Sequence, residues 1–195
     1  MYPKIENFLT NILRNHYLYR YLFKRGCNIH TMNSFGCNPV LWCAQGRGDL
    51  LTFEWFRENG CNIFLINNNG HGVLHKAAQR GHQVICEWFL TTFRDLVDGI
   101  QLLDSFGPDV EGCCPSDLAG MEGHVELAKW LAAKEIEVAL RVIQPQASFA
   151  LPSWFTSSTQ FFDMRIFHQD LYAWEKLGGV RRMQYKVLKQ HEETQ

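Results

Sequence analysis

The stretch GHGVLHKAAQRGHQVICEWF, residues 70–89, decides the fold because its spacing of Leu, Ala, Gly and Trp recurs on both sides. Five residue types recur at one constant offset of 33 in the numbering, a coincidence that is rare outside internal repeats. These pairs are Leu41 and Leu74, Ala44 and Ala77, Gly48 and Gly81, Trp55 and Trp88, and Phe56 and Phe89. The chain is therefore predicted to contain stacked copies of one small unit.

A third copy of the pattern lies further along the chain. Its positions follow those of the second copy at an offset of 42, at Ala119, Gly123, Trp130 and Leu131. Because this offset exceeds the first by nine, an insertion of that length is predicted between Thr91 and Pro108.

An incomplete copy lies upstream. GCNIHTMNSFG at residues 26–36 matches GCNIFLINNNG at residues 60–70, this time at an offset of 34. The first full unit is therefore expected to hold one extra residue, which the alignment places between Gly36 and Ala44. The units are predicted near residues 1–32, 33–66, 67–108 and 109–144, and together they make one repeat array over residues 1–144.

Each unit opens with a turn signal, an Asn or Asp three positions before a Gly, because both residue types tolerate a tight, partly left-handed backbone. These signals are Asn33–Gly36, Asn67–Gly70 and Asp109–Gly112. A short helix is expected next, opened by Asn38-Pro39 or Cys114-Pro115. It ends at a glycine suited to the left-handed position past a helix, namely Gly48, Gly81 or Gly123. A second helix with an apolar stripe follows, for example at residues 83–90.

A tip, a short helix, a glycine stop and a second helix within about 33 residues is the ankyrin period. GVLHKAAQRGHQVICEWFL at residues 72–90 resembles that family's consensus of Thr-Pro-Leu-His, Ala-Ala and Gly-His before an aliphatic helix. GCCPSDLAGMEGHVELAKWL at residues 112–131 is similar. The resemblance covers roughly residues 15–140 and implies an all-α ankyrin-repeat solenoid of about three full repeats plus a degenerate N-terminal unit.

Four tryptophans depart from the family pattern. Trp42 stands in place of the usual His, and Trp55, Trp88 and Trp130 stand in place of an aliphatic residue. At one per repeat, the last three are predicted to form a stacked seam in the core, because each buries a large apolar area. The outer helix of the third unit is expected to present a polar cap to solvent through Lys129, Lys134, Glu135 and Glu137.

Composition excludes several classes of partner. The chain has 195 residues and a net charge of -1, so no overall field attracts nucleic acid or an anionic membrane. No apolar run reaches the ~18 residues of a spanning helix. Seven cysteines without a framework, and no N-terminal secretion signal, predict reduced thiols and an intracellular, cytoplasmic protein, with the nucleus and organelles left open.

The histidines are interpreted as structural. The resemblance places His75 where the family's His bonds to neighbouring backbone, and His82 and His124 in the Gly-His turn. A zinc site is disfavoured because tight paired ligand spacing is missing from the candidate set of Cys27, His30, Cys37 and Cys43. No nucleophile with a base, carboxylate pair or phosphate-binding loop stands out, so no catalytic residue, metal, cofactor or small-molecule substrate is predicted.

Stacked repeats offer an extended surface, so a protein partner is predicted, bound by the tips and short helices. The candidate tip residues are His30, Met32, Phe35, Phe64, Ile66, Asn68 and His71. On the short helices, positions that face the concave groove in the ankyrin family are occupied by Cys43, Arg47, Lys76, Arg80, Met121 and Glu122. For each apolar tip residue the alternative is packing against a neighbouring tip.

Residues 145–195 show no repeat and form a predicted aromatic C-terminal extension. Eight Phe, Trp or Tyr residues lie between Phe149 and Trp174, too many for a disordered linker, so the segment is expected to dock. Docking on a partner, through residues such as Trp154, Phe155 and Trp174, is favoured over packing on the convex side of the stack. Nucleic acid is not expected, except for a possible RNA contact by a basic helix at residues 180–191.

Two functions from different classes fit these observations. The first is a non-enzymatic adaptor or scaffold that binds proteins through its tips and concave helix face. The second is a fixed structural subunit of a large intracellular or organellar assembly, anchored by the C-terminal extension and touching RNA.

Overall fold

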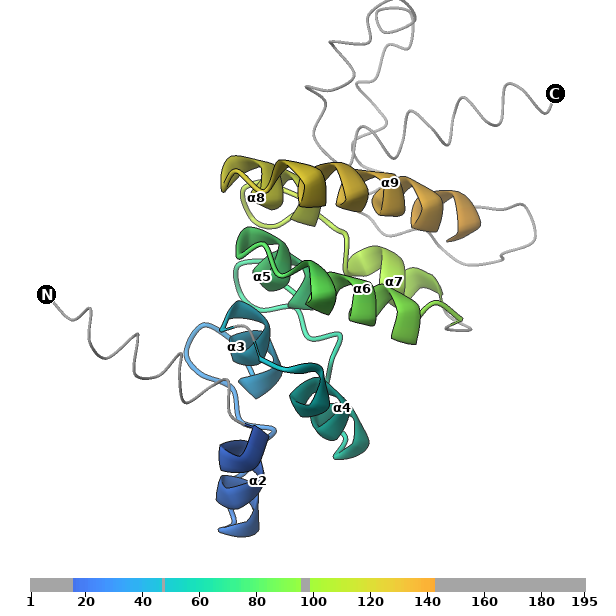
Figure 1. The fold of residues 1–195 in the computed structure, drawn as a ribbon. Helices are drawn as coiled ribbons and strands as arrows, with labels where there is room; N and C mark the ends of the chain where they lie inside the picture. Colours follow the sequence, from blue (N-terminus) through green and yellow to red (C-terminus); the bar gives the residue numbers. More distant parts are fainter. Residues whose placement is uncertain (1–15, 47, 96–98, 143–195) are drawn as a thin grey trace, which may run out of the picture.

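The computed structural model describes residues 16–46, 48–95 and 99–142 (Figure 1). These residues contain eight helices and no strand. Within them, no helix is both long enough and apolar enough to cross a membrane. Arg47, the aromatic extension with Trp154, Phe155 and Trp174, and the predicted basic helix lie outside the described residues, so these predictions remain expectations.

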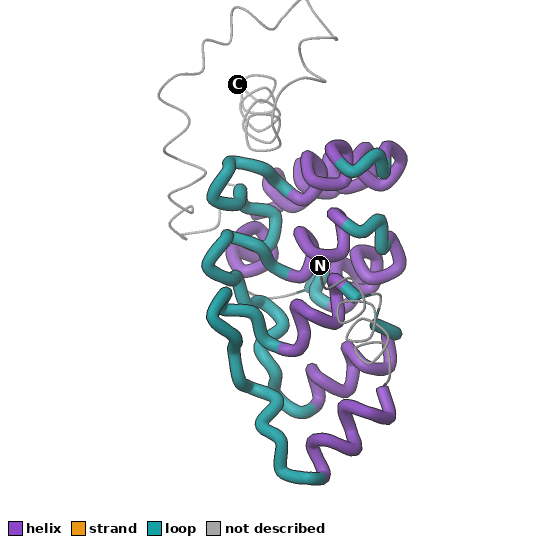
Figure 2. Tube along the Cα trace, turned by 90° about the vertical axis from the view of Figure 1, so that its left-hand side faces the viewer, coloured by secondary structure: helices purple, strands orange, loops and turns teal. Residues whose placement is uncertain are grey.

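The helices form pairs, each with a short helix and a second helix after it. The pairs are α3 (Pro39–Gln45) with α4 (Leu50–Glu58), α5 (Val73–Gln79) with α6 (Gln83–Thr92), and α8 (Pro115–Met121) with α9 (Val125–Val142). Helix α2 (His16–Lys24) packs against α4 and supplies the degenerate N-terminal unit. Figure 1 shows the short helices stacked in one column and the second helices in another, and in Figure 2 the loops that precede the short helices line one side of the stack. The predicted all-α solenoid is confirmed.

Each tip is organised by one Asx side chain, as the turn signals predicted. Asn67 Oδ1 accepts hydrogen bonds from the backbone N–H groups of Asn69 at 3.0 Å and His71 at 2.9 Å. Gly70 closes the turn with a φ of 79°, a left-handed conformation that favours glycine. The same two bonds form at Asn33 and Asp109.

The tips of neighbouring units are also joined by backbone hydrogen bonds. Asn68 N–H donates to the Phe35 carbonyl at 3.1 Å, and Val110 N–H donates to the Asn69 carbonyl at 3.1 Å. These bonds satisfy backbone groups that would otherwise need water, and they fix each tip relative to the next.

The extra residue of the first full unit lies in a different place from the one predicted. The first residues of α3 and α5 are related by an offset of 34, whereas those of α4 and α6 are related by an offset of 33. The additional residue therefore falls after α3, between Gly46 and Gly48, and not between Gly36 and Ala44.

The glycine that ends this turn also has a different role from its counterparts. Gly81 and Gly123 have φ values of 68° and 81°, as predicted for residues just past a helix, but Gly48 is not in the left-handed region. A Cβ at Gly48 would instead overlap the Cys43 Sγ. Close approach to α3 therefore requires glycine at Gly48.

The predicted insertion forms an additional helix. Helix α7 (Gly99–Asp104) lies between Thr91 and Pro108 and packs against α9. Leu102, Leu103 and Phe106 are buried. The insertion is thus part of the core rather than a surface loop.

The predicted tryptophan seam is wrong in detail. In each unit the residue that follows the tryptophan is buried more deeply than the tryptophan, and Phe56, Phe89 and Leu131 are each exposed by 1% or less. Trp88 is 9% exposed, and its ring centroid lies 5.0 Å from that of Phe53. Its indole N–H donates to Glu54 Oε1 at 2.7 Å, a bond that keeps one edge of the ring at the surface. Trp55 and Trp130 are half-buried, and no two tryptophan rings stack within the described residues.

The predicted polar cap on α9 also needs correction, because Glu135 is fully buried. Its carboxylate accepts hydrogen bonds from the Ser116 backbone N–H at 3.0 Å and from the Ser116 hydroxyl at 2.8 Å. Glu135 therefore joins α9 to the start of α8. Lys129 and Glu137 are exposed and Lys134 is half-exposed, as expected for a solvent-facing side.

Candidate protein-binding face

The candidate face runs along the short helices on the side that the second helices do not cover. Trp42 and Lys76 both occupy the fourth position of their helices, and Met121 occupies the seventh position of α8. Positions three apart share one side of a helix, so these residues point the same way. Trp42 is 38% exposed and Met121 is 71% exposed, which makes the face partly apolar.

The tips extend this face with further exposed apolar side chains. Phe35 is 60% exposed and Val110 is 72% exposed. The backbones of both residues take part in the hydrogen bonds between tips, so the contacts between units fix the positions of their side chains. We use the name tip–helix face for Phe35, Trp42, Lys76, Arg80, Val110 and Met121.

The tip–helix face carries positive charge in the second unit. Arg80 is exposed at the end of α5, and Lys76 is half-buried one turn earlier. Burial, together with the neighbouring guanidinium of Arg80, lowers the pKa of Lys76, although Cys37 acts in the opposite sense. A carboxylate of a ligand placed beside the two cations would favour the charged form of Lys76 and so offset both effects.

Most of the predicted short-helix residues lie at the surface, but Cys43 does not. Lys76, Arg80, Met121 and Glu122 are exposed or half-exposed. Cys43 is completely buried, and burial raises the pKa of its thiol, with Asp49 adding to the effect. Its predicted place in the groove is therefore wrong, because the side chain points into the contact with Gly48.

The predicted tip residues fall into two groups. His30, Met32, Phe35, Ile66 and Asn68 are exposed, and the Asn68 side-chain amide donates to the Ser34 carbonyl at 3.2 Å. Phe64 instead packs its ring against Phe89 and Phe93, with centroid distances of 5.4 and 4.7 Å. Because the ring of Phe64 packs in the interior of the stack, we leave this residue out of the tip–helix face.

His71 joins two units. Its Nε2 lies 3.0 Å from Asp109 Oδ2, its side chain is 14% exposed, and its ring stacks on that of His75 at 5.5 Å. Burial alone would raise the pKa of Asp109, but hydrogen bonds from Cys113, His71 and Glu111 bring it below the ordinary value. His71 thus faces the next tip, so we leave it out of the tip–helix face as well.

The structural interpretation of His75 and His82 is confirmed. His75 is fully buried, donates from Nε2 to the Gly107 carbonyl at 2.9 Å and accepts at Nδ1 from Gly72 N–H at 3.3 Å. Burial is the main cause that lowers the pKa of His75 to about 4, so the ring is neutral in the folded protein. His82 Nδ1 donates to the Ala44 carbonyl of the preceding unit at 2.9 Å.

Two residues of the tip–helix face, Trp42 and Val110, were not predicted. The sequence contains a signal for each. Trp42 shares its helical position with Lys76, and Val110 follows Asp109 as Asn68 follows Asn67. Comparing equivalent positions would have found Val110, whereas Trp42 aligns with Lys76 only in the register that the helix ends reveal.

Within the described residues, no group of three or more His, Cys, Asp or Glu side chains lies close enough together to hold a metal ion. All seven cysteines are free thiols, and five of them are buried.

Comparison with known proteins agrees with the architecture. A family model described as ankyrin repeats, three copies, matches residues 40–141, which is more than half of the chain. No curated protein matches the sequence. The matched region runs from the second residue of α3 to the next-to-last residue of α9 and so spans the three helix pairs, and the chain belongs to the ankyrin-repeat family.

Proposed function

We propose that the protein is a non-enzymatic interaction module, an adaptor or scaffold, that binds a partner protein on its tip–helix face. Ankyrin repeats generally mediate contacts between proteins. The observation that carries the proposal is the exposure of large apolar side chains on two tips and one short helix, with Phe35 at 60%, Val110 at 72% and Met121 at 71%. Apolar groups gathered on one face of a protein mark a contact site more often than scattered ones do.

The chemistry of the face supports a particular kind of partner. Aromatic and Met side chains are enriched where proteins bind, and arginine often supplies a strong polar contact beside them. Trp42, Phe35 and Met121 would receive apolar side chains of the partner, while Lys76 and Arg80 would receive a carboxylate. A partner segment with apolar residues flanked by Asp or Glu fits this pattern.

The proposal is tested by recovering partners from cell extract with the tagged full-length chain and identifying them by mass spectrometry. Two variants are compared with the unmodified protein, Met121→Asp on α8 and Arg80→Glu at the end of α5. Each is expected to weaken binding of the partner about tenfold or more, as truncation of a central contact does. Circular dichroism and melting should stay unchanged, because both side chains are exposed.

Leu51→Asp provides the matched control, because Leu51 is 69% exposed and lies on α4, outside the tip–helix face. It should keep every partner. Retention of the partners by both face variants, or their loss in the Leu51 variant, would show that the interface lies elsewhere.

A further inference from the structure

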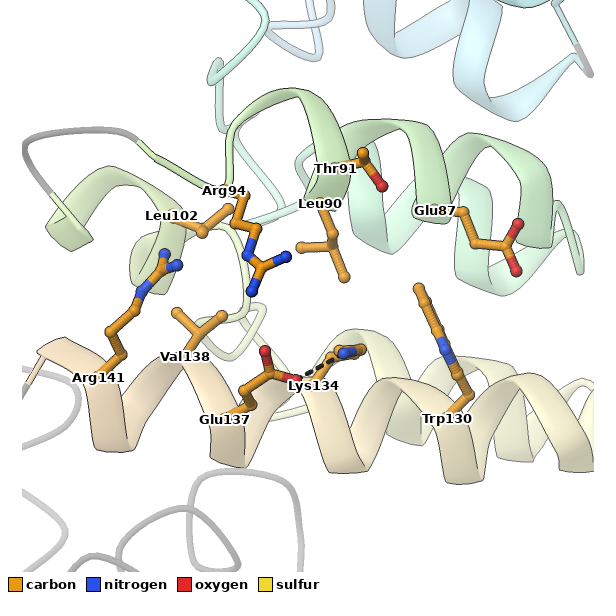
Figure 3. Close-up of a pocket in the computed structure, with 10 residues that line it drawn as sticks. All are labelled: Glu87, Leu90, Thr91, Arg94, Leu102, Trp130, Lys134, Glu137, Val138 and Arg141. Atoms are coloured by element: carbon orange, nitrogen blue, oxygen red, sulfur yellow. Dashed lines mark hydrogen bonds and ion pairs between the residues drawn. The ribbon is translucent and has the colours of Figure 1, made fainter.

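A pocket lies between the second helices of the second and third units, outside the tip–helix face. It has a volume of about 220 Å³ and is lined by residues of α6, α7 and α9, with Arg94 just beyond the end of α6 (Figure 3). Leu102 of the inserted helix α7 forms part of its wall.

The pocket combines an apolar lining with cationic groups. Leu90, Leu102 and Val138 supply aliphatic surface, and Trp130 stands at one end (Figure 3). The side chains of Arg94 and Arg141 approach the other end. Because a cavity of about 150 Å³ is enough to hold benzene, a pocket of this size has room for a phenyl ring.

The charges in the pocket are not balanced. Lys134 is paired with Glu137 at 2.6 Å, and Glu87 accepts a hydrogen bond from Gln83 at 2.7 Å. Arg94 and Arg141 form no ion pair within the described part of the chain. The end of the pocket that they occupy is therefore suited to a carboxylate, which guanidinium groups bind with two parallel hydrogen bonds.

We propose that the pocket holds a segment of this same chain, Phe161-Phe162-Asp163 of the C-terminal extension. The chain leaves α9 at Val142, next to the pocket residue Arg141. From there to residue 162 it contains no charged residue, and Asp163 is the first, directly after two phenylalanines. This combination of two rings and one carboxylate matches an apolar pocket with two arginines at its end.

The chain after α9 is long enough for residues 161–163 to reach back to the pocket. The residues between Arg141 and Phe161 span up to about 60 Å when extended. The part of α9 from Trp130 to Arg141 is about 16 Å long. The segment is therefore long enough to reach every part of the pocket. The aromatic extension would then dock on its own repeat array, and the tip–helix face would remain available to a partner.

The test is hydrogen–deuterium exchange of the full chain, read by mass spectrometry on peptides that cover residues 159–164. The amides of the docked segment should exchange about tenfold or more slowly than an unstructured peptide, because a hydrogen bond to a charged group shifts a local opening equilibrium by that order. Arg141→Glu and Asp163→Arg should each remove the protection. The double variant, which exchanges the two charges, should recover the protection. For every variant, the measured exchange rates are compared with those expected for its own sequence when unstructured.

Lys129→Glu is the matched control, since it reverses a charge on the same helix outside the pocket and should leave the protection unchanged. Melting of every variant is recorded, and Arg141 is exposed, so folding is expected to persist. Exchange at unstructured rates in the unmodified chain, or protection that survives Arg141→Glu, overturns the proposal. Protection that appears only at high protein concentration also overturns it, because the segment then docks on a second copy.

Discussion

His75 should make the folded protein sensitive to mild acid. Burial, with a smaller effect of His71, lowers the pKa of His75 from 6.5 to about 4, although the Gly107 carbonyl and Asp109 oppose the change. As the pH falls, the unfolded chain therefore takes up a proton at this residue before the folded chain does. The contribution of His75 to the free energy of unfolding should decrease as the pH falls through 6.5 and level off below about 4.

The size of the effect follows from the difference between the two pKa values. Each pKa unit corresponds to about 1.4 kcal/mol, so His75 accounts for about 3 kcal/mol over the whole range and about 2 kcal/mol between pH 8 and pH 5. This is a large fraction of the stability of a small domain, which is about 5 to 15 kcal/mol.

The assay is urea unfolding followed by circular dichroism at these two pH values, on the unmodified protein and on His75→Gln. Glutamine keeps a donor for the Gly107 carbonyl but does not titrate. Other groups contribute equally in both proteins, so the unmodified protein should lose about 2 kcal/mol more than the variant on acidification. Equal losses in the two proteins, or an NMR titration of the His75 ring with an ordinary midpoint, would refute the reasoning.

Two further changes test the core and the tips. Trp88→Ala should lower the free energy of unfolding by about 3 to 5 kcal/mol, as large aromatic truncations do, and urea unfolding with a loss below about 1 kcal/mol would contradict the packing of this ring on Phe53. Gly70→Ala and Gly112→Ala both place a side chain at positive φ, but only at Gly70 would the new Cβ meet backbone, 2.7 Å from the Asp109 Cα. Thermal melting should therefore show a larger loss for Gly70→Ala than the roughly 1 kcal/mol expected for Gly112→Ala, and equal losses would argue against the contact between tips.

Features set by neighbouring residues could be predicted from the sequence. The Asx-Gly tips depend on bonds between residues close in the chain, and the helix pairs follow from repeat spacing, so both were predicted. The position of the extra residue was not, because the short helices contain similar residues side by side. Leu41 aligns with Leu74 at an offset of 33 and with His75 at an offset of 34. Ala44 aligns with an alanine at both offsets, with Ala77 at 33 and with Ala78 at 34. Only the observed helix ends separate the two registers.

Features set by distant contacts could not be predicted. Trp55-Phe56 and the equivalent pairs place two large residues side by side, and the sequence does not say which of them the neighbouring unit will cover. Glu135 looks like a surface residue on a charged helix until Ser116 is brought beside it. Among the predicted tip residues, likewise, the sequence does not mark Phe64 as a packed residue, and its contact with Phe89 of α6 is seen only in the structure.

Helix α7 has a consequence for how this array can evolve. Repeat proteins lengthen and shorten by gain or loss of whole units, which is tolerated because successive interfaces are interchangeable. Here the contact between the second and third units includes α7 against α9, and no equivalent helix separates the first full unit from the second within the described residues. A unit duplicated at this junction would present a surface shaped for a different neighbour. We therefore expect units to be gained or lost on the N-terminal side of the array and not between the second and third units.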